Sequence, residues 1–200
     1  MSSKPTPAAK RTAPQVPAAA ASFATRVIAW QRKHGRHDLP WQNTRDAYRI
    51  WVSEIMLQQT QVAAAIGYYA RFLERFPNVA TLAQAPQEEV MRYWAGLGYY
   101  SRARNLHRAA QIVVDEWGGA FASSPEQLAT LPGIGRSTAA AIAVFAFGRR
   151  AAILDGNVKR VVARCFGTVG YPGEKKSKKR SGSGFQACCH APARRRTHKV

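Results

Sequence analysis

The sequence has 200 residues and a formal net charge of +19, with 30 lysines and arginines against 11 acidic residues. This length suffices for one hydrophobic core or two small lobes. No stretch has the length of a membrane span or the pattern of a secretory signal, and the three cysteines do not form a disulfide scaffold, so we expect an intracellular, cytoplasmic protein. The charge favours a polyanionic partner, most simply nucleic acid, with a generic basic surface as the alternative.

The N-terminal part begins with residues 1–21, whose Ala, Pro, Ser and Lys content predicts a disordered leader. A first helix is expected from apolar side chains at helical spacing, which are Phe23, Val27 and Trp30, and it should end at Gly35. A second helical pattern runs from Asp46 to Phe76. Because it is long for one globular helix, we expect it to break near Thr60.

Further helices are predicted along the rest of the chain. Residues 81–98 indicate a short helix with Pro86 in its first turn, and residues 99–119 indicate another that closes at two glycines. Ser124 should cap a short helix, and residues 136–148, which are apolar on all sides, predict a buried one. Asp155 or Asn157 could begin the last helix.

No segment alternates as a strand does, so the predicted fold class is all-α. We expect four parts after the leader: an N-terminal helix and loop at 22–45, a helical bundle at 46–148, the start of a second lobe at 149–173, and a basic disordered tail at 174–200. The bundle should contain a helix-hairpin-helix at about 125–148.

The turn "LPGIG", residues 131–135, joins two predicted helices. A Gly-x-Gly turn before a helix N-terminus points backbone N–H groups into one concavity, which suits a phosphate. Such a turn contacts the nucleic-acid backbone without reading sequence. We therefore expect Gly133, Ile134, Gly135, Arg136 and Ser137 to bind DNA phosphate, although a tight helix–helix turn without a ligand has the same pattern.

The acidic residue Glu54 lies within the apolar segment "IWVSEIMLQQTQV". Helical spacing places Ile50, Glu54, Leu57, Gln58 and Gln61 on one face. A carboxyl group in such surroundings must be paired, hydrogen-bonded or protonated, and burial makes it a usable general acid. The alternative is a structural glutamate. The neighbouring glutamine amides could contact either base edges or solvent.

A second acidic residue, Asp155, follows an apolar run and precedes Gly156. An aspartate there is most simply a helix N-cap. It lies 20 residues after Gly135, however, beyond the predicted buried helix, which could return it to the hairpin.

Together these segments resemble the helix-hairpin-helix DNA glycosylases, and within them the MutY family of adenine DNA glycosylases. The resemblance covers about residues 23–173, through "LPWQ", "WVSEIMLQQTQV", "FPNVATLAQAP", "WAGLGYYSRARNLHRAA", "LPGIGRSTAAAI" and "ILDGNVKRVVAR". It implies an intracellular, nucleoid-associated monomer of bacterial type. The substrate would be double-stranded DNA with adenine opposite guanine or 8-oxoguanine.

The resemblance also implies roles for individual residues. Glu54 would protonate the flipped adenine, and Asp155 would stabilise the oxocarbenium-like sugar or bond to it transiently. Gln59 and Tyr100 match positions that contact or wedge the duplex, and Trp41, Leu57 and Val62 match the adenine pocket wall. The other expected pocket and lesion contacts are Gln58, Thr60 and Ser137.

Ser137 occupies the position where endonuclease III-like relatives carry a lysine that attacks the sugar. A serine cannot form a Schiff base, so the resemblance implies a monofunctional glycosylase rather than a bifunctional glycosylase and lyase. Lys159 is interpreted as a phosphate contact or a surface charge.

The family's [4Fe–4S] cluster needs four cysteines, but this sequence has three, with Cys165 expected to be packed and Cys188 adjacent to Cys189. We therefore expect no metal site, a C-terminally truncated chain, and exposed apolar surface at Phe23, Val27 and Trp30. The alternative function is a catalytically inactive DNA-binding fragment.

Overall fold

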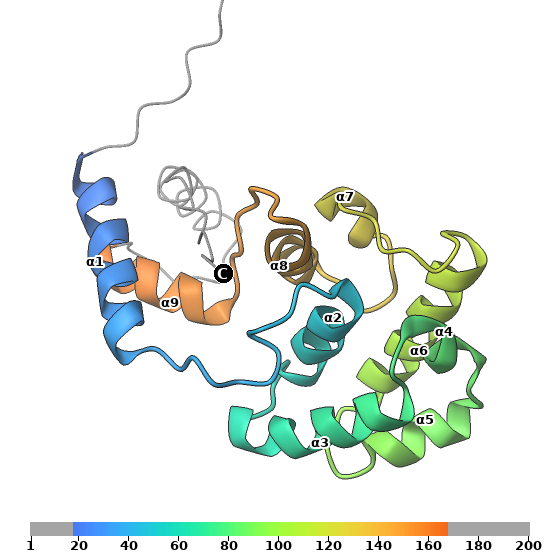
Figure 1. The fold of residues 1–200 in the computed structure, drawn as a ribbon. Helices are drawn as coiled ribbons and strands as arrows, with labels where there is room; N and C mark the ends of the chain where they lie inside the picture. The colour runs from blue at the N-terminus through green and yellow to red at the C-terminus, as the bar shows by residue number, and fades with distance from the viewer. Residues whose placement is uncertain (1–17, 168–200) are drawn as a thin grey trace, which may run out of the picture.

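The computed structural model describes residues 18–167, with side chains from Ser22 onward, and in this range it contains helices and loops without a strand (Figure 1). The all-α prediction is therefore confirmed. The helices are α1 (Ala18–His34), α2 (Ala47–Met56), α3 (Val62–Arg75), α4 (Val79–Gln84), α5 (Gln87–Trp94), α6 (Ser101–Asp115), α7 (Pro125–Leu128), α8 (Arg136–Phe147) and α9 (Gly156–Cys165). None of these described helices could cross a membrane. The predicted tail, residues 174–200, lies outside the described residues.

The first two predicted helices occur with adjusted bounds. Helix α1 begins at Ala18 rather than near residue 22, because the alanine run at its start has high helix propensity. It ends at His34, and the Gly35 N–H donates to the Gln31 carbonyl at 2.8 Å. The long pattern from Asp46 divides between Met56 and Val62, which confirms the expected break near Thr60.

The short helix predicted around Pro86 within residues 81–98 corresponds to α5, but α4 before it was not predicted from the sequence. The Asn78 side chain caps α4 by accepting from the Thr81 N–H at 2.9 Å. Pro86 precedes α5 instead of lying in its first turn. The chain breaks here because a residue before proline avoids the helical conformation, and Ala85 is extended with ψ 146°.

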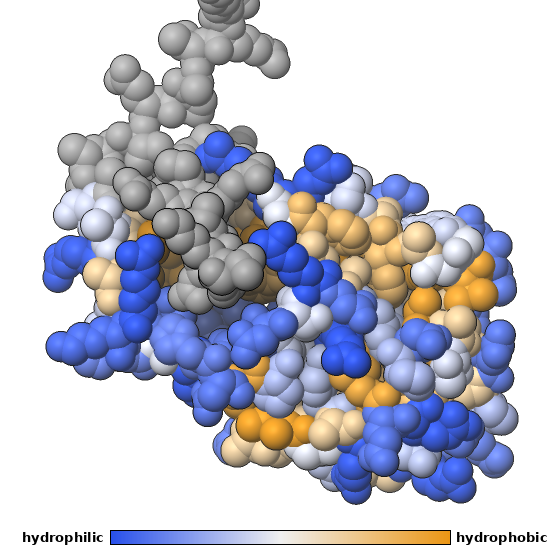
Figure 2. All heavy atoms as spheres, viewed as in Figure 1, coloured by the Kyte–Doolittle hydropathy of each residue, from blue (hydrophilic) through white to orange (hydrophobic). Residues whose placement is uncertain are grey.

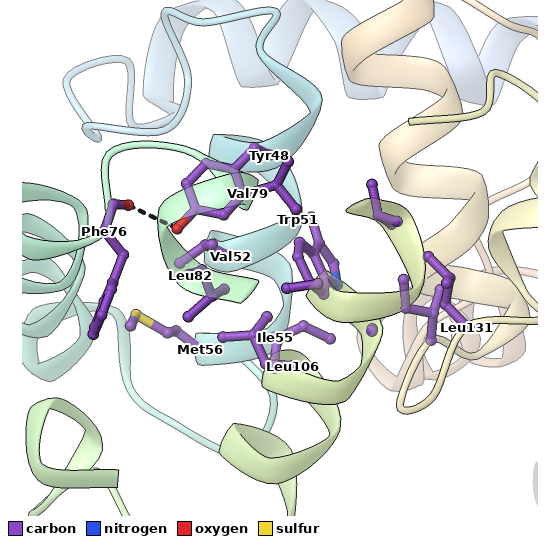
Figure 3. Close-up of a cluster of buried hydrophobic side chains, with 14 of the residues drawn as sticks. Tyr48, Trp51, Val52, Ile55, Met56, Phe76, Val79, Leu82, Leu106 and Leu131 are labelled. Carbon is purple, nitrogen blue, oxygen red and sulfur yellow. Dashed lines mark hydrogen bonds between the residues drawn. The ribbon is translucent and has the colours of Figure 1, made fainter. Parts of the chain in front are cut away.

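Helices α2–α8, hereafter the helical body, enclose the hydrophobic core. Helix α2 is central and contacts α3, α6 and α8. Its Trp51, Val52 and Met56 are almost fully buried. Figure 3 shows these side chains beside Leu82 and Leu106, and shows the Tyr48 hydroxyl donating to the Phe76 carbonyl at 2.7 Å. The core therefore fixes the orientation of α2.

Helices α1 and α9, hereafter the α1–α9 pair, lie together at one side of the helical body (Figure 1). The Phe23 and Phe166 rings pack edge to face with centroids 5.2 Å apart. Val27 and Trp30 are exposed as expected, at 45% and 62%, whereas Phe23 is partly buried.

The prediction that Cys165 is packed is wrong. This residue is exposed at the last position of α9. The helical body does not extend over this turn, and Val162 is the buried apolar residue of α9.

Candidate active site

An open cavity of about 760 Å³ lies between the loop before α2, one face of α2, and α8. Its volume is within the range of small-molecule sites in proteins. Helix α2 contributes Ile50, Ser53 and Glu54, which share a face because they are three and four residues apart. The other lining residues are Trp41, Gln42, Asn43, Thr44, Arg45 and Phe145. The cavity thus places the predicted residues Trp41 and Glu54 together.

Glu54 has the perturbed acidity expected of a buried carboxyl group. Its pKa is raised from 4.5 to about 7, first because burial removes water from the ionised form and second because Asp155 adds negative charge. At neutral pH a substantial fraction of Glu54 is therefore protonated. A carboxyl group in this state can donate a proton to a ligand in the cavity.

Asp155 has a different environment, since it is exposed and does not line the cavity. Its Oδ1 accepts a hydrogen bond of 2.7 Å from the Val158 N–H and caps α9. Of the two residues predicted to begin the last helix, Asp155 is therefore the N-cap, and Asn157 lies within the helix. The charge of Asp155 still reaches Glu54, because it contributes to the raised pKa of that residue.

The loop before α2 is held by its own contacts. The Gln42 side chain accepts from the Leu39 N–H at 3.2 Å and donates to the Arg36 carbonyl at 3.0 Å. The Trp41 ring packs against Tyr69 with centroids 5.3 Å apart. Sequence reasoning found Trp41 but missed Gln42 and the three residues after it. They could have been predicted as cavity residues only because they follow Trp41 in the chain.

The turn after α2 corrects the expected single helical face. Ile50 and Glu54 do share a face, but Leu57 caps the helix, so Gln58 and Gln61 lie beyond its end. The Gln58 amide approaches the Thr138 hydroxyl at 3.5 Å, next to Ser137 on α8. Thr60 lies in the same turn and is partly buried. The predicted amide cluster is therefore a loop that contacts α8.

Two residues near this turn have strained backbones. Gln59 has φ 57° and Tyr99 has φ 49°, and they are the non-glycine residues with positive φ in the described chain. Each such conformation costs about 1–3 kcal/mol and is typical of functional sites. Tyr100, which was predicted to contact the duplex, is also exposed and precedes α6. Val62 begins α3 after the first turn.

Arg102 of α6 connects the two strained turns. It is buried, and it donates hydrogen bonds to oxygens on both sides. Sequence reasoning missed it, because an arginine in "YYSRARN" has the pattern of a surface cation. Only contacts between distant segments distinguish it from its exposed neighbour Arg104.

The helix-hairpin-helix is formed by α7, the turn at residues 129–135, and α8. Gly133 has φ +77°, and a Cβ there would lie 2.9 Å from the Asn105 Cβ, so glycine is required twice over. Ile134 is buried beneath the turn, whereas Arg136 is exposed and Ser137 is partly buried. Gly135 provides no side-chain cap for α8, which leaves its first N–H groups available to an anion.

Hydrophilic side chains are spread over the face shown in Figure 2 and are not confined to the hairpin. The hydropathy of this face alone therefore does not mark an interface. The described residues contain no group of three or more His, Cys, Asp or Glu that could hold a metal ion. Cys165 is the cysteine among them and is exposed, and Cys188 and Cys189 lie outside the described residues.

Comparison with known proteins places these features in context. Residues 52–186 match the family model described as HhH-GPD superfamily base excision DNA repair protein. An adenine DNA glycosylase of Buchnera aphidicola subsp. Baizongia pistaciae is 46% identical over 144 residues, or 72% of this chain and 41% of that protein. The Mus musculus adenine DNA glycosylase is 47% identical over 152 residues, or 72% of this chain and 29% of that protein. The chain spans less than half the length of these relatives.

Solved structures agree on the fold. A thermostable thymine-DNA glycosylase superposes with a TM-score of 0.74 at 27% identity, over 84% of this chain and 80% of that one. An endonuclease III from a non-covalent DNA complex gives a TM-score of 0.65 at 19% identity, over 84% of each chain. The second likeness concerns the fold alone.

Proposed function

The chain belongs to the HhH-GPD superfamily of base excision DNA repair proteins, and from this premise we propose that it excises adenine from mispaired DNA. The substrate is double-stranded DNA with adenine opposite 8-oxoguanine or guanine, bound by a monomer. The curated relatives quoted above carry the name adenine DNA glycosylase, which supports this base over others.

The observation that carries the proposal is the Glu54 carboxyl group in its cavity, with a pKa near 7. Adenine leaves the sugar readily only when a ring nitrogen is protonated, and a protonated Glu54 supplies that proton. The adenine must first leave the base stack to reach the cavity. Trp41, which lines the same cavity as Glu54, offers an aromatic surface for the extruded base.

Asp155 completes the pair of carboxylates. Departure of the base leaves positive charge on the sugar, and the exposed carboxylate of Asp155 stabilises that charge or bonds to it transiently. Its electrostatic effect on Glu54 supports this assignment. The two groups therefore divide the work of acid and charge stabiliser according to their environments.

The reaction ends when water adds to the sugar in place of the base and leaves an abasic site. Ser137 has no amine to attack the sugar, so the chain lacks the Schiff-base chemistry of a lyase at this position. The hairpin residues Gly133 to Ser137 hold the DNA phosphates during the reaction, because the uncapped start of α8 presents N–H groups.

The test is excision from a duplex with one adenine opposite 8-oxoguanine, followed by alkali and detection of strand scission. We expect scission only after alkali, and Glu54→Gln should reduce the rate by about 10²–10⁴-fold. The matched control is Glu116→Gln, on the far end of α6. Salt-sensitive DNA binding without scission would contradict the proposal and leave an inactive DNA-binding fragment.

A further inference from the structure

We propose that Arg102 is a positioning residue, whose guanidinium holds the turns at Gln59 and Tyr99 in the conformation that displaces the target base. This inference rests on the proposed function, since it concerns the step that brings adenine to Glu54. Neither turn lines the cavity, so the effect of Arg102 on the reaction is indirect.

The first set of contacts joins Arg102 to the end of α2. One terminal nitrogen, which carries two N–H groups, lies within hydrogen-bond distance of oxygens of four residues, which share these two donors. They are the carbonyls of Ile55 at 3.0 Å, Met56 at 2.9 Å and Gln58, and the Thr60 hydroxyl at 3.2 Å. The last carbonyls of a helix have no partner within it and carry partial negative charge. Arg102 therefore closes α2 and fixes the turn that contains Gln59.

The second set of contacts joins the same side chain to the loop before α6. Its other terminal nitrogen donates to the carbonyls of Leu97 at 3.3 Å and Gly98 at 3.1 Å. The Trp94 indole N–H also donates to the Gly98 carbonyl at 3.1 Å. The guanidinium lies 5.4 Å from the Trp94 ring centroid and 5.5 Å from that of Tyr99. One planar group thus fixes two turns that are about 40 residues apart in sequence.

The burial of this cation indicates why it must be arginine. Arg102 is only 7% exposed, and among the described residues its hydrogen-bond partners are uncharged oxygens rather than carboxylates. Burial removes water from the guanidinium and lowers its pKa. The free-energy cost of burying this charge is offset by several hydrogen bonds. A lysine ammonium lacks the planar fork and cannot reach both turns in this geometry.

The consequence concerns the side chains that the turns present. Gln59 and Tyr99 are exposed, and each has a left-handed backbone that relaxes if nothing holds it. A base is displaced efficiently only by groups that are already in place, because misplacement by about 1 Å can reduce a rate about 100-fold. Arg102 supplies that rigidity, while Glu54 supplies the proton.

The first experiment measures hydrogen exchange in Arg102→Lys, with Arg108→Lys as the control, since Arg108 is exposed on the same helix. We expect faster exchange in Arg102→Lys at the amides of residues 57–61 and 96–100, and unchanged exchange at the hairpin. Equal exchange rates at these amides in the unmodified protein, Arg102→Lys and Arg108→Lys would overturn the inference. If Arg102→Lys does not fold, Thr60→Val removes one acceptor with the core intact and should loosen residues 57–61.

The second experiment follows base displacement by fluorescence of 2-aminopurine placed at the target adenine. A Glu54→Gln background keeps the glycosidic bond intact. We expect the rise in fluorescence to be about 100-fold slower with Arg102→Lys, at unchanged salt dependence of binding. Equal rates would overturn the inference alone, whereas a duplex that stays stacked with Arg102 present would overturn it together with the proposed function.

A third measurement separates positioning from catalysis. Adenine in a bulge costs less to displace, so this substrate should restore most of the excision rate of Arg102→Lys. It should not restore Glu54→Gln, which lacks the acid. A defect of Arg102→Lys that persists undiminished on the bulged substrate would overturn the positioning role.

Discussion

The helical body and the α1–α9 pair hold the two carboxylates in different ways. Glu54 belongs to α2, whose neighbours Trp51, Val52 and Ile55 are buried in the core. Asp155 begins α9, where Val162 is the buried apolar residue and Val161 is 47% exposed. The comparison teaches that tertiary packing sets the acidity of Glu54, whereas a local cap sets the position of Asp155.

The largest expected difference between the two regions is in stability. Phe72→Ala in the helical body removes a fully buried ring that packs on Phe76 and Trp94, and should cost about 3–5 kcal/mol. The matched change Phe166→Ala, in the α1–α9 pair, should cost less than about 1 kcal/mol, because this ring is 45% exposed. Urea unfolding measures both, and equal costs would break the comparison.

The next effect concerns Glu54 and pH. Its pKa is about 7 in the folded protein and near 4.5 when unfolded, so the folded state binds the proton more tightly. The ionised group therefore destabilises the fold increasingly as pH rises from about 4.5 to about 7, and the penalty then stays constant. Glu54→Gln should raise the free energy of unfolding by about 3 kcal/mol at pH 8 and by little at pH 4. Thermal unfolding at both pH values measures this, and a gain independent of pH would contradict it.

Gly133 tests the hairpin of the helical body. Gly133→Ala introduces a Cβ at positive φ and against Asn105, and should cost about 1–2 kcal/mol with weaker DNA binding. The control Gly135→Ala has φ −81° and no neighbouring atom within 4 Å, so its stability should change little. Calorimetry measures the stability of the two variants, and titrations measure their DNA binding. If both variants lost stability to a similar extent, the backbone geometry of Gly133 would not be the reason for its requirement.

The smallest effect on stability belongs to Asp155, although its replacement should also slow excision, because we propose that this carboxylate stabilises the sugar cation. Asp155→Ala removes the cap of α9 and should cost about 1 kcal/mol, whereas Asp155→Asn keeps the cap. Both remove a negative charge that raises the pKa of Glu54, so the pH at which the residual activity declines should move to lower values. A pH–rate profile of Asp155→Asn with an unchanged upper limb would show that the two carboxylates are not coupled.

The sequence by itself determined the features that depend on neighbours along the chain. The absence of strand alternation predicted an all-α fold, the excessive length of the pattern after Asp46 predicted the break near Thr60, and the residue types at Ser124 and Asp155 predicted caps. Each depends on backbone hydrogen bonds or side-chain periodicity within a few residues. The tight turn at Gly133 was found for the same reason.

Only the tertiary structure decided the features that join distant segments. It placed residues 42–45 and Phe145 around Glu54, and it removed Gln61 from the face expected for it. It also buried Arg102 between two turns, which no local pattern distinguishes from the exposed Arg104. The burial of a residue and the electrostatic field at it depend on all the segments that pack around it. The raised pKa of Glu54 and the contacts of Arg102 therefore exist only once the chain has folded.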